Sequence, residues 1–196
     1  MIAGIVLAAG LARRMGRSKL LLDWGGRPVI RRAVEQVRAG GVDEVIVVVG
    51  PEDAAIRQAL SELPVRFVQN PAPETGQGRS IACGVAALGP GVQAVLIALG
   101  DQPTLPPEVI PQLLQTYRQT GKPIVAPVYR GVQGNPVLFA SSVFAELREL
   151  TGDRGARGLL ERDAGRLAFV AFDLHMPPDL DTPGEYERLR PPDARV

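Results

Sequence analysis

The chain alternates short apolar runs, rich in β-branched residues, with segments whose apolar residues recur at helical spacing. The runs that predict strands are residues 2–7, 44–49, 65–68, 94–99, 123–128, 136–139 and 167–172. Several are apolar throughout, as expected of strands that helices cover on both faces. The alternation therefore predicts an α/β fold, doubly wound and Rossmann-like, with a mostly parallel sheet and helices on both faces.

Two apolar stripes predict helices between the strands. Residues 30–37 carry apolar side chains at positions i, i+3, i+4 and i+7, and residues 81–88 repeat them at a similar spacing. Further helices are predicted to begin near Pro51, Pro106 or Pro107, Ser142, Gly155 and Pro183. No repeat or linker divides the pattern, so one domain is predicted over residues 1–190, with a flexible tail at residues 191–196.

Composition excludes several classes of partner and chemistry. The 22 basic and 21 acidic residues leave a net charge of +1, too weak a field to hold a nucleic-acid polymer or an anionic membrane. One cysteine, Cys83, and one histidine, His175, exclude an intramolecular disulfide and any Cys-rich or two-histidine metal site. The single cysteine and the lack of a targeting segment predict a cytoplasmic protein.

Polar loops at residues 8–28, 69–79 and 100–106 each follow a predicted strand. In open α/β sheets, ligands bind beyond the carboxyl ends of the strands, so these loops mark the expected site. The first loop begins with small residues, whose backbone amides can approach phosphate oxygens closely. Four cations then occupy positions 13, 14, 17 and 19. The combination predicts a triphosphate site, although a solvated basic loop would show the same charges.

The first loop matches neither of two common phosphate-binding motifs. A Walker A loop would need lysine directly after Gly16, where Arg17 stands. The dinucleotide pattern Gly-x-Gly-x-x-Gly is also missing, which disfavours a nicotinamide enzyme. Lys19 is informative because Lys122 is the only other lysine among the 22 basic residues. A compact, mobile charge suits the bridging of adjacent phosphates better than a planar guanidinium does.

Carboxylates in two further segments predict a metal site. Asp101 follows the strand at residues 94–99, and a hard cation such as Mg2+ is held by one or two carboxylates plus substrate phosphates. Asp101 is therefore the predicted metal ligand, with a helix cap as the alternative. Asp181, near Pro183, is either a second metal contact or the cap of the next helix, and capping needs no function. Asn70 is either a base-recognition residue or part of an Asn-Pro turn.

Residues 7–19 carry the most specific resemblance to a known family. Their Leu-Ala-Ala-Gly stretch and the cations behind it resemble the signature of the MobA-like nucleotidyltransferases that activate molybdenum cofactor. The stretch is more similar to the cytidylyl, MocA-like branch, because the guanylyl branch usually has a second glycine where Ala9 stands. Ala12 departs from the serine often found there. The resemblance extends from Ile2 to about Leu189.

The resemblance implies roles for later segments. Residues 100–103, Gly-Asp-Gln-Pro, are similar to the family's metal-binding strand end, and residues 179–183 to its C-terminal Asp-x-Asp-Thr-Pro segment. Asn135, Asp153 and Arg157 lie in stretches that resemble two motifs of the cytidylyl branch. There they would orient the acceptor and meet its phosphate, whereas without the resemblance they read as turn, cap and surface residues.

These patterns together assign the expected site. The predicted nucleotide-binding residues are Leu7, Ala8, Ala9, Gly10, Gly16, Asn70, Gly76 and Ser80. The predicted acceptor-binding residues are Gln102, Asn135, Asp153 and Arg157. The predicted catalytic residues are Arg14, Lys19 and Asp101, and the predicted ligands of Mg2+ are Asp101 and Asp181.

The resemblance implies a nucleotidyltransferase fold and the transfer of CMP from CTP to the terminal phosphate of molybdopterin, with release of pyrophosphate. Other reactions stay open: guanylyl transfer from GTP, or transfer to a sugar phosphate or an isoprenoid-precursor phosphate. A non-catalytic chaperone that binds molybdenum cofactor is the alternative from another class. The expected partners are CTP or another NTP, a molybdopterin-type small molecule, and a molybdoenzyme or its chaperone.

Overall fold

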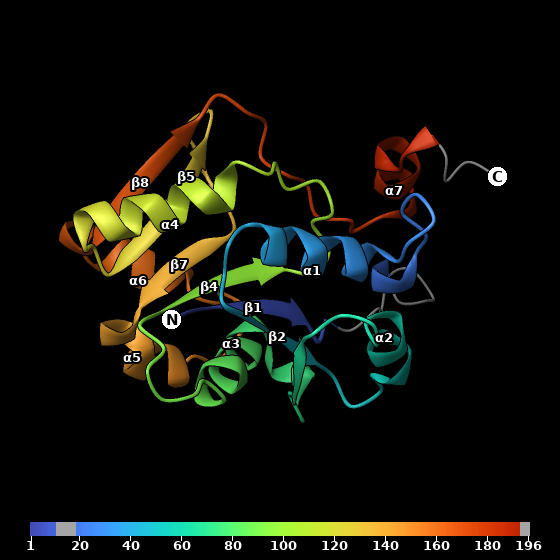
Figure 1. The fold of residues 1–196 in the computed structure, drawn as a ribbon, viewed down its shortest axis with the longest axis horizontal. Coiled ribbons are helices and arrows are strands. Elements are labelled where there is room, and N and C mark those ends of the chain that lie inside the picture. The colour runs from blue at the N-terminus through green and yellow to red at the C-terminus, as the bar shows by residue number, and fades with distance from the viewer. Residues whose placement is uncertain (11–18, 193–196) are drawn as a thin grey trace.

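A computed structural model describes residues 1–10 and 19–192 of the chain. Its strands form an eight-stranded sheet in the order β3-β2-β1-β4-β7-β5-β6, and β8 pairs with β5 outside this path (Figure 1). The strands are β1 (Ile2–Ala8), β2 (Glu44–Val49), β3 (Arg66–Gln69), β4 (Ala94–Leu99), β5 (Ile124–Tyr129), β6 (Val132–Gln133), β7 (Val137–Ala140) and β8 (Leu167–Phe172). Parallel pairs join β3 to β2, β2 to β1, β1 to β4 and β5 to β8. β7 runs antiparallel to β4 and β5.

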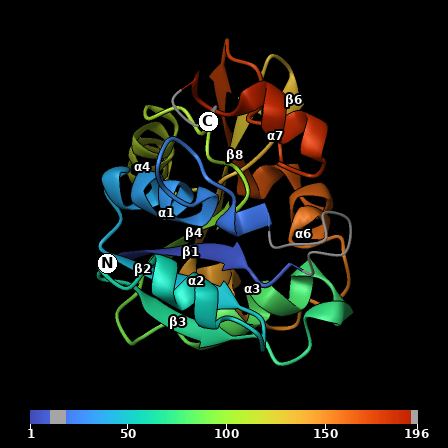
Figure 2. The same cartoon turned by 90° about the vertical axis from the view of Figure 1, so that its right-hand side faces the viewer.

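Helices cover both faces of the sheet (Figures 1 and 2). The helices are α1 (Val29–Ala39), α2 (Ala54–Ala59), α3 (Gln77–Ala86), α4 (Val109–Thr120), α5 (Phe144–Arg148), α6 (Arg157–Arg162) and α7 (Pro183–Leu189), and short 3-10 helices span Lys19–Leu21, Pro73–Thr75, Ser141–Val143 and Ala164–Arg166. Side chains of α1, α2 and α4 form one core cluster with Val6 of β1. Those of α3, α5 and α6 form a second cluster with Ile5 and Leu7. Successive residues of a strand point to opposite faces, so β1 is buried from both sides and the predicted fold class is confirmed.

The sequence patterns locate most elements closely. The seven predicted strands begin and end within one residue of the observed ones. β6 was not predicted, because two residues are too few to show a period. Except for the one that begins at Pro183, helices predicted from prolines or turn residues begin two or three residues later than expected. Pro106, for example, forms a turn in which its carbonyl accepts from the amide of Val109, and α4 begins only there.

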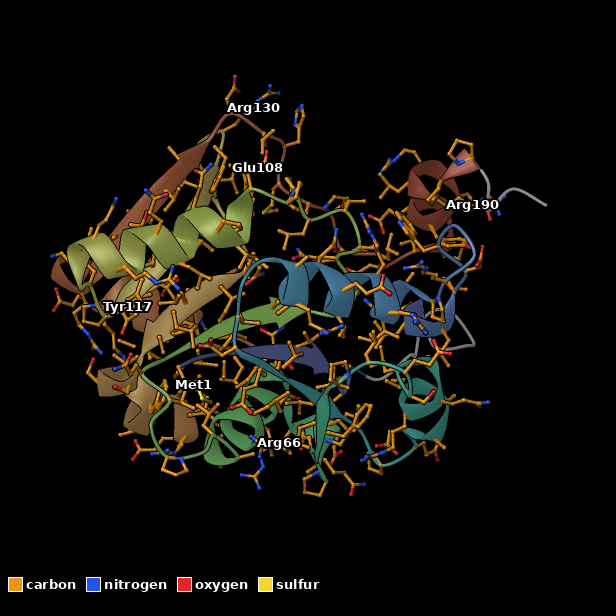
Figure 3. The ribbon with its side chains drawn as sticks, viewed as in Figure 1. Met1, Arg66, Glu108, Tyr117, Arg130 and Arg190 are labelled. Atoms are coloured by element: carbon orange, nitrogen blue, oxygen red, sulfur yellow. The ribbon has the colours of Figure 1, made fainter. Side chains whose placement is uncertain are left out.

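The outer edge of the sheet is polar. β3 is the edge strand, and Arg66 projects from it toward Glu44 on β2, with 3.7 Å between their charged atoms (Figure 3). Charged side chains at an edge strand discourage pairing with strands of other molecules. Among the described residues, no helix has the length and apolarity needed to cross a membrane.

A third apolar cluster fastens the C-terminal segment over the carboxyl end of the sheet. Leu22, Trp24 and Val29 pack there with Leu180 and Tyr186. We call residues 177–182 the strap. The Tyr186 hydroxyl donates to the carbonyl of Asp23, and the amide of Leu180 donates to the carbonyl of Asp101. The strap is therefore fixed beside the strand end that carries Asp101. Residues 193–196 of the predicted tail lie outside the described part of the chain.

Candidate active site

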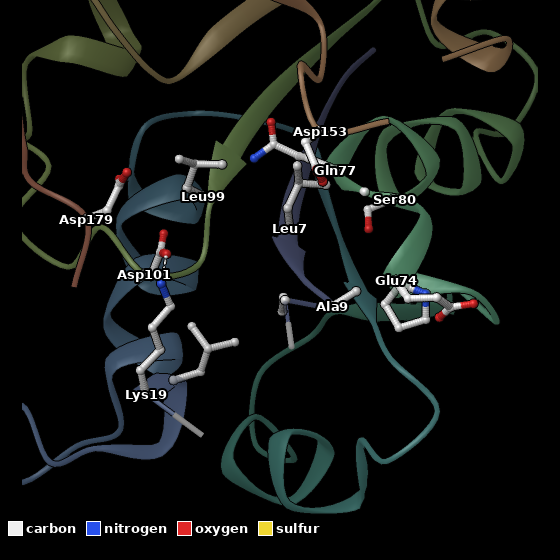
Figure 4. A pocket seen from close by; sticks show the side chains of 15 residues that line it. Leu7, Ala9, Lys19, Glu74, Gln77, Ser80, Leu99, Asp101, Asp153 and Asp179 are labelled. Carbon is white, nitrogen blue, oxygen red and sulfur yellow. Dashed lines mark ion pairs between the residues drawn. The ribbon is translucent and has the colours of Figure 1, made fainter. Parts of the chain in front are cut away.

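A cavity of about 440 Å³ opens beyond the carboxyl ends of β1 and β4 (Figure 4). Its walls come from β1 and the residues after it, from α3, from the end of β4 and from the strap. The lining residues are Leu7, Ala8, Ala9, Gly10, Lys19, Leu20, Pro73, Glu74, Gly76, Gln77, Ser80, Leu99, Asp101, Asp153 and Asp179. We call it the first cavity. It lies where an open α/β sheet is expected to bind its ligand.

Lys19 joins two carboxylates that are far apart in the sequence. Its Nζ lies 2.6 Å from Oδ2 of Asp101 and 2.7 Å from Oδ1 of Asp181. Partial burial lowers the pKa of Lys19, but the adjacent charges of Asp101 and Asp181 raise it more, so the pKa lies above its usual value. Three residues predicted to act at the site are thus brought together, and the ammonium stays protonated at neutral pH.

A glycine lets Asp101 reach this position. Gly100 donates its amide to the carbonyl of Leu7. A Cβ at Gly100 would lie 2.8 Å from Cδ1 of Ile30 and 2.9 Å from the carbonyl oxygen of Leu7. Only a residue without a side chain allows β4 to approach α1 and β1 so closely at its end. The approach places Asp101 level with the backbone that follows β1.

Asp179 is a lining residue that the sequence did not reveal. Burial and the nearby charge of Asp101 raise the pKa of its carboxyl. Gln102 is buried and donates from Nε2 to Oδ1 of Asp179 at 2.8 Å and to the carbonyl of Pro177 at 3.1 Å. The prediction that Gln102 binds the acceptor does not fit this arrangement, because its amide nitrogen holds the strap. The sequence feature that could have revealed Asp179 is its place in the same Asp-x-Asp-Thr-Pro segment as Asp181.

Asn70 also differs from its predicted role. Its side chain is completely buried, with Nδ2 donating to Oγ of Ser80 at 3.0 Å and Oδ1 accepting from the amide of Ala72 at 3.0 Å. Both ends of the amide are committed within the protein, and Asn70 does not line the first cavity. Direct contact with a base therefore does not fit the structure. Asn70 instead positions Ser80, which does line the cavity.

The remaining predicted nucleotide residues fall into two groups. Residues 7–10, Gly76 and Ser80 all line the first cavity. Gly76 has φ +101°, a conformation that L side chains rarely adopt, which explains a glycine at this point. Gly16 and the predicted catalytic Arg14 lie outside the described residues. Glu74 and Gln77, which the sequence patterns did not single out, also line this cavity.

Two of the predicted acceptor residues, Asn135 and Arg157, line a second cavity, of about 110 Å³. It is lined by Leu7, Gln77, Ile81, Ile97, Leu99, Gln133, Gly134, Asn135, Val137, Phe139, Arg154, Ala156, Arg157 and Leu160. The Tyr129 hydroxyl donates to the carbonyl of Asn135 and so fixes that turn. Asp153, the other predicted acceptor residue, lines the first cavity instead.

Asp181 does not cap α7, which was the simpler of its two predicted roles. Thr182 is the cap: its Oγ1 accepts from the amide of Glu185, and the Glu185 carboxylate accepts from the amide of Thr182. Hydrogen bonds that the carboxylate accepts from the hydroxyl and the amide of Thr182 lower the pKa of Glu185. The neighbouring residue carries the cap, so the Asp181 carboxylate is available to Lys19.

The oxygen ligands fit a divalent cation that also binds substrate. Asp101 and Asp181 converge on one ammonium, and carboxylates are the ligands that hard cations prefer. Within residues 1–10 and 19–192, no group of three or more His, Cys, Asp or Glu side chains is arranged to hold a metal by itself. A cation at this point would therefore complete its shell with phosphate oxygens and water, as Mg2+ commonly does.

A doubly wound sheet with a ligand-sized cavity at its carboxyl edge is typical of enzymes that bind nucleotides. The model of the MobA-like NTP transferase domain matches residues 4–167, and the chain belongs to that family. The purine catabolism protein PucB of Bacillus subtilis and the nicotine blue oxidoreductase of Paenarthrobacter nicotinovorans are each 30% identical to it, with 96% of both chains covered. The structure of Rv0371C from Mycobacterium tuberculosis, solved in complex with manganese, superposes with a TM-score of 0.83 at 28% identity, covering 96% of this chain and 97% of that one.

Proposed function

We propose that this chain transfers CMP from CTP to the terminal phosphate of a molybdopterin-type cofactor and releases pyrophosphate. The observation that carries the proposal is the position of Lys19, whose ammonium lies against Asp101 and Asp181 in the cavity that residues 7–10 also line. A cation, two carboxylates and a closely approachable backbone at one point suit a metal-bound triphosphate.

Lys19 would neutralise charge that develops on the leaving pyrophosphate. Its raised pKa keeps it cationic throughout the neutral range. Asp101, with Asp181, would hold a divalent cation, Mg2+ or Mn2+, and such a cation supplies positive charge to the phosphate oxygens when bound. Preorganised charge of this kind is commonly the largest single contribution to catalysis.

The second cavity would receive the acceptor. An oxygen of the acceptor's terminal phosphate attacks the α-phosphorus and forms the new P–O bond. The bond from that phosphorus to the bridging oxygen breaks, and its electron pair leaves with pyrophosphate. Attack in line with the leaving group requires the acceptor to arrive from the opposite side. The second cavity adjoins the first and offers Arg157 to an anionic group, while Arg154, which also lines it, pairs with Glu161.

The choice of CTP rests on the resemblance of residues 7–10 to the cytidylyl branch. Ala9, which stands where the guanylyl branch usually has a glycine, is buried beside the first cavity. A methyl group in that wall leaves less room for a base than glycine does. The smaller pyrimidine is therefore the expected base, and GTP is the first alternative.

The names of the two relatives point to different chemistry, since one refers to purine catabolism and the other to an oxidoreductase. We prefer nucleotidyl transfer because the family match is to NTP transferases. The chain also lacks the Gly-x-Gly-x-x-Gly pattern of dinucleotide sites. An oxidoreductase activity would need its cofactor bound without that motif.

The test is pyrophosphate release from CTP, GTP, ATP and UTP, with Mg2+ or Mn2+ and molybdenum cofactor as acceptor. Asp101→Ala is the inactive variant, and Asp173→Ala is its matched control. Asp173 pairs with Arg130 away from both cavities, and its side chain is 92% exposed. Release with CTP that is lost in Asp101→Ala and retained in Asp173→Ala is the expected result.

Other outcomes distinguish the alternatives. Release with GTP in place of CTP assigns guanylyl transfer. Release only with sugar phosphates or isoprenoid-precursor phosphates replaces the acceptor. Tight binding of molybdenum cofactor without pyrophosphate release from any nucleotide contradicts catalysis and supports the chaperone role.

A further inference from the structure

The two cavities meet at a narrow boundary. Among the described residues, Leu7, Gln77 and Leu99 line both of them. Leu7 and Leu99 are apolar residues at the ends of β1 and β4. In the described part of the chain, Gln77 is therefore the one polar side chain that both cavities share. A reaction that joins a group in one cavity to a group in the other must take place beside it.

We propose that the Gln77 carboxamide donates a hydrogen bond to the acceptor's terminal phosphate and holds it for attack on the α-phosphorus. The inference rests on the proposed function, because it needs a phosphate acceptor in the second cavity. It assigns Gln77 a contact with the reacting group, while charge neutralisation belongs to Lys19 and Arg157.

The backbone around Gln77 is built by close contacts with residues 151–156. A Cβ at Gly76 would lie 2.3 Å from the carbonyl carbon of Gly152, and a Cβ at Gly78 would lie 2.7 Å from the carbonyl oxygen of Thr151. The amide of Gly78 donates to the carbonyl of Gly152 at 2.8 Å. Glycines on both sides of Gln77 thus allow two loops to pack directly on each other. Gln77 is consequently held at a fixed point.

A third glycine leaves room for the side chain. Gly155, with φ +53°, packs on the amide oxygen: a Cβ there would lie 2.3 Å from Oε1 of Gln77. Figure 4 shows the carboxamide projecting across Leu7, with its nitrogen directed toward Leu99. In this structure the oxygen of the carboxamide lies beside Gly155, and the nitrogen faces the boundary. A donor is the group that an anionic phosphate requires.

A neutral donor is suited to this position. The attacking phosphate oxygen must keep its electron pair, so no proton needs to move to or from Gln77 during the reaction. A hydrogen bond to a charged oxygen is worth more than one between neutral groups, and it fixes direction as well as distance. Arg157 supplies charge from the second cavity, and Gln77 supplies alignment at the boundary.

Three variants test the inference. Gln77→Met keeps a similar length without the donor, and Gln77→Glu replaces the donor with a negative acceptor. Gln115→Met is the control, because Gln115 is exposed on α4 and lines neither cavity. For each protein, CTP affinity is measured by titration and the acceptor's kcat and KM by pyrophosphate release.

The expected result is a split between the two substrates. Gln77→Met should leave the Kd for CTP within about twofold and lower kcat/KM for the acceptor roughly 10- to 100-fold, the range for a lost hydrogen bond to a charged group. Gln77→Glu should lower it further through repulsion, and Gln115→Met should match the wild type. Gln77→Lys, which restores a donor, should recover part of the activity.

Unchanged acceptor kinetics in Gln77→Met overturn the inference while the proposed function stands. Equal losses in CTP and acceptor binding, with a lowered melting temperature, also overturn it, because they indicate a structural role only. If wild-type protein uses a different phosphate acceptor, the proposed function fails, and the same series is run with that acceptor. Wild-type protein that transfers to no acceptor overturns both.

Discussion

The two cavities differ sharply in charge although they share a boundary. Among the described residues, carboxylates predominate in the first: Glu74, Asp101, Asp153 and Asp179 line it, with Lys19 as the one cation. In the second, the described charged residues are arginines, Arg154 and Arg157, of which Arg154 pairs with Glu161, and the rest of the wall combines amide side chains with apolar ones. The carboxylates of this described part of the wall would attract a cation, which favours a metal-bound nucleotide in the first cavity.

The second cavity suits a different kind of anion. Arginines bind a phosphate directly, without an intervening cation. Apolar side chains such as Ile81 and Ile97 suit the ring system of an organic body attached to that phosphate. On the proposed function, the two phosphate groups would be held side by side by opposite means, and one metal would serve only the nucleotide. Metal dependence should therefore separate the two cavities.

Asp101→Asn should have the largest effect, because it should impair metal binding in the first cavity. The substitution removes the negative charge that attracts the cation while keeping the side chain's shape. Turnover should fall about 10²- to 10³-fold, as it does when a charge-stabilising group is lost. The metal concentration that gives half the maximal rate should rise, and the acceptor's KM should stay constant. Titration of Mg2+ at saturating CTP and acceptor measures the first two quantities, and titration of the acceptor at saturating Mg2+ and CTP measures its KM.

The exposed Asp173 provides the matched control for that variant. Asp173→Asn should leave the metal titration unchanged, because its side chain pairs with Arg130 away from both cavities. Wild-type metal dependence in Asp101→Asn would contradict the assignment of the first cavity to a metal-bound nucleotide.

Lys19→Met should have the next largest effect, of about 10²-fold on turnover, because charge on the leaving pyrophosphate is no longer neutralised. The variant also frees Asp101 and Asp181 from their shared ammonium. The metal concentration for half-maximal rate should therefore not rise, unlike in Asp101→Asn. Lys122→Met is the control, since Lys122 donates to the carbonyl of Gly165 at a distance from both cavities. A rise in the metal requirement would assign Lys19 to cation binding instead.

Arg157→Met should impair acceptor binding in the second cavity and leave the first cavity unaffected. Loss of a charge-assisted hydrogen bond predicts a rise of roughly 10- to 100-fold in the acceptor's KM. The Kd for CTP and the metal titration should not change. Arg148→Met, on the exposed side of α5, should behave as the wild type. A weakened affinity for CTP in Arg157→Met would show that the cavities do not divide the substrates.

The sequence predicts where the strands end better than it predicts where polar side chains point. Strand ends were predictable because continuous apolar runs stop at the loops, and this placed Asp101 and residues 7–10 at the site. The sequence does not show which way a polar side chain turns. Asn70 and Gln102 looked like ligand contacts from their positions, yet burial commits both to partners inside the protein.

The sequence contains little that predicts the residues at the boundary between the two cavities. Gln77 begins α3 between two glycines, and nothing in its neighbourhood separates it from an ordinary helix start. Its position becomes visible only when residues 75–78 pack on residues 151–156, which are far away in the sequence. Asp179 was missed for a similar reason, since the strap is placed by the cluster around Trp24 and Tyr186. Packing between segments that are distant in the sequence determines the positions of both Gln77 and Asp179.

The smallest expected effect comes from the strap, which contributes to the first cavity only. Thr182→Ala removes the side chain that accepts from the amide of Glu185 at the start of α7. Loss of such a cap typically destabilises a protein by about 1 kcal/mol. Because the strap carries Asp179 and Asp181, the affinity for CTP with metal should weaken slightly, by less than about threefold. The acceptor's KM should stay constant, and Ser142→Ala, at an exposed serine, should change neither property.

The pH dependence of that loss tests its cause. Hydrogen bonds from Thr182 hold the pKa of Glu185 below its usual 4.5, so the ionised carboxylate is the form that stabilises α7. This stabilisation is complete above the ordinary pKa and is lost as pH falls through the lowered pKa of the folded state. Urea unfolding at about pH 7 and about pH 3 should therefore show a difference between wild type and Thr182→Ala that shrinks in acid. A difference that is equal at both pH values would mean that the threonine stabilises the strap by packing, and that the reciprocal cap contributes little to holding Asp181 at the first cavity.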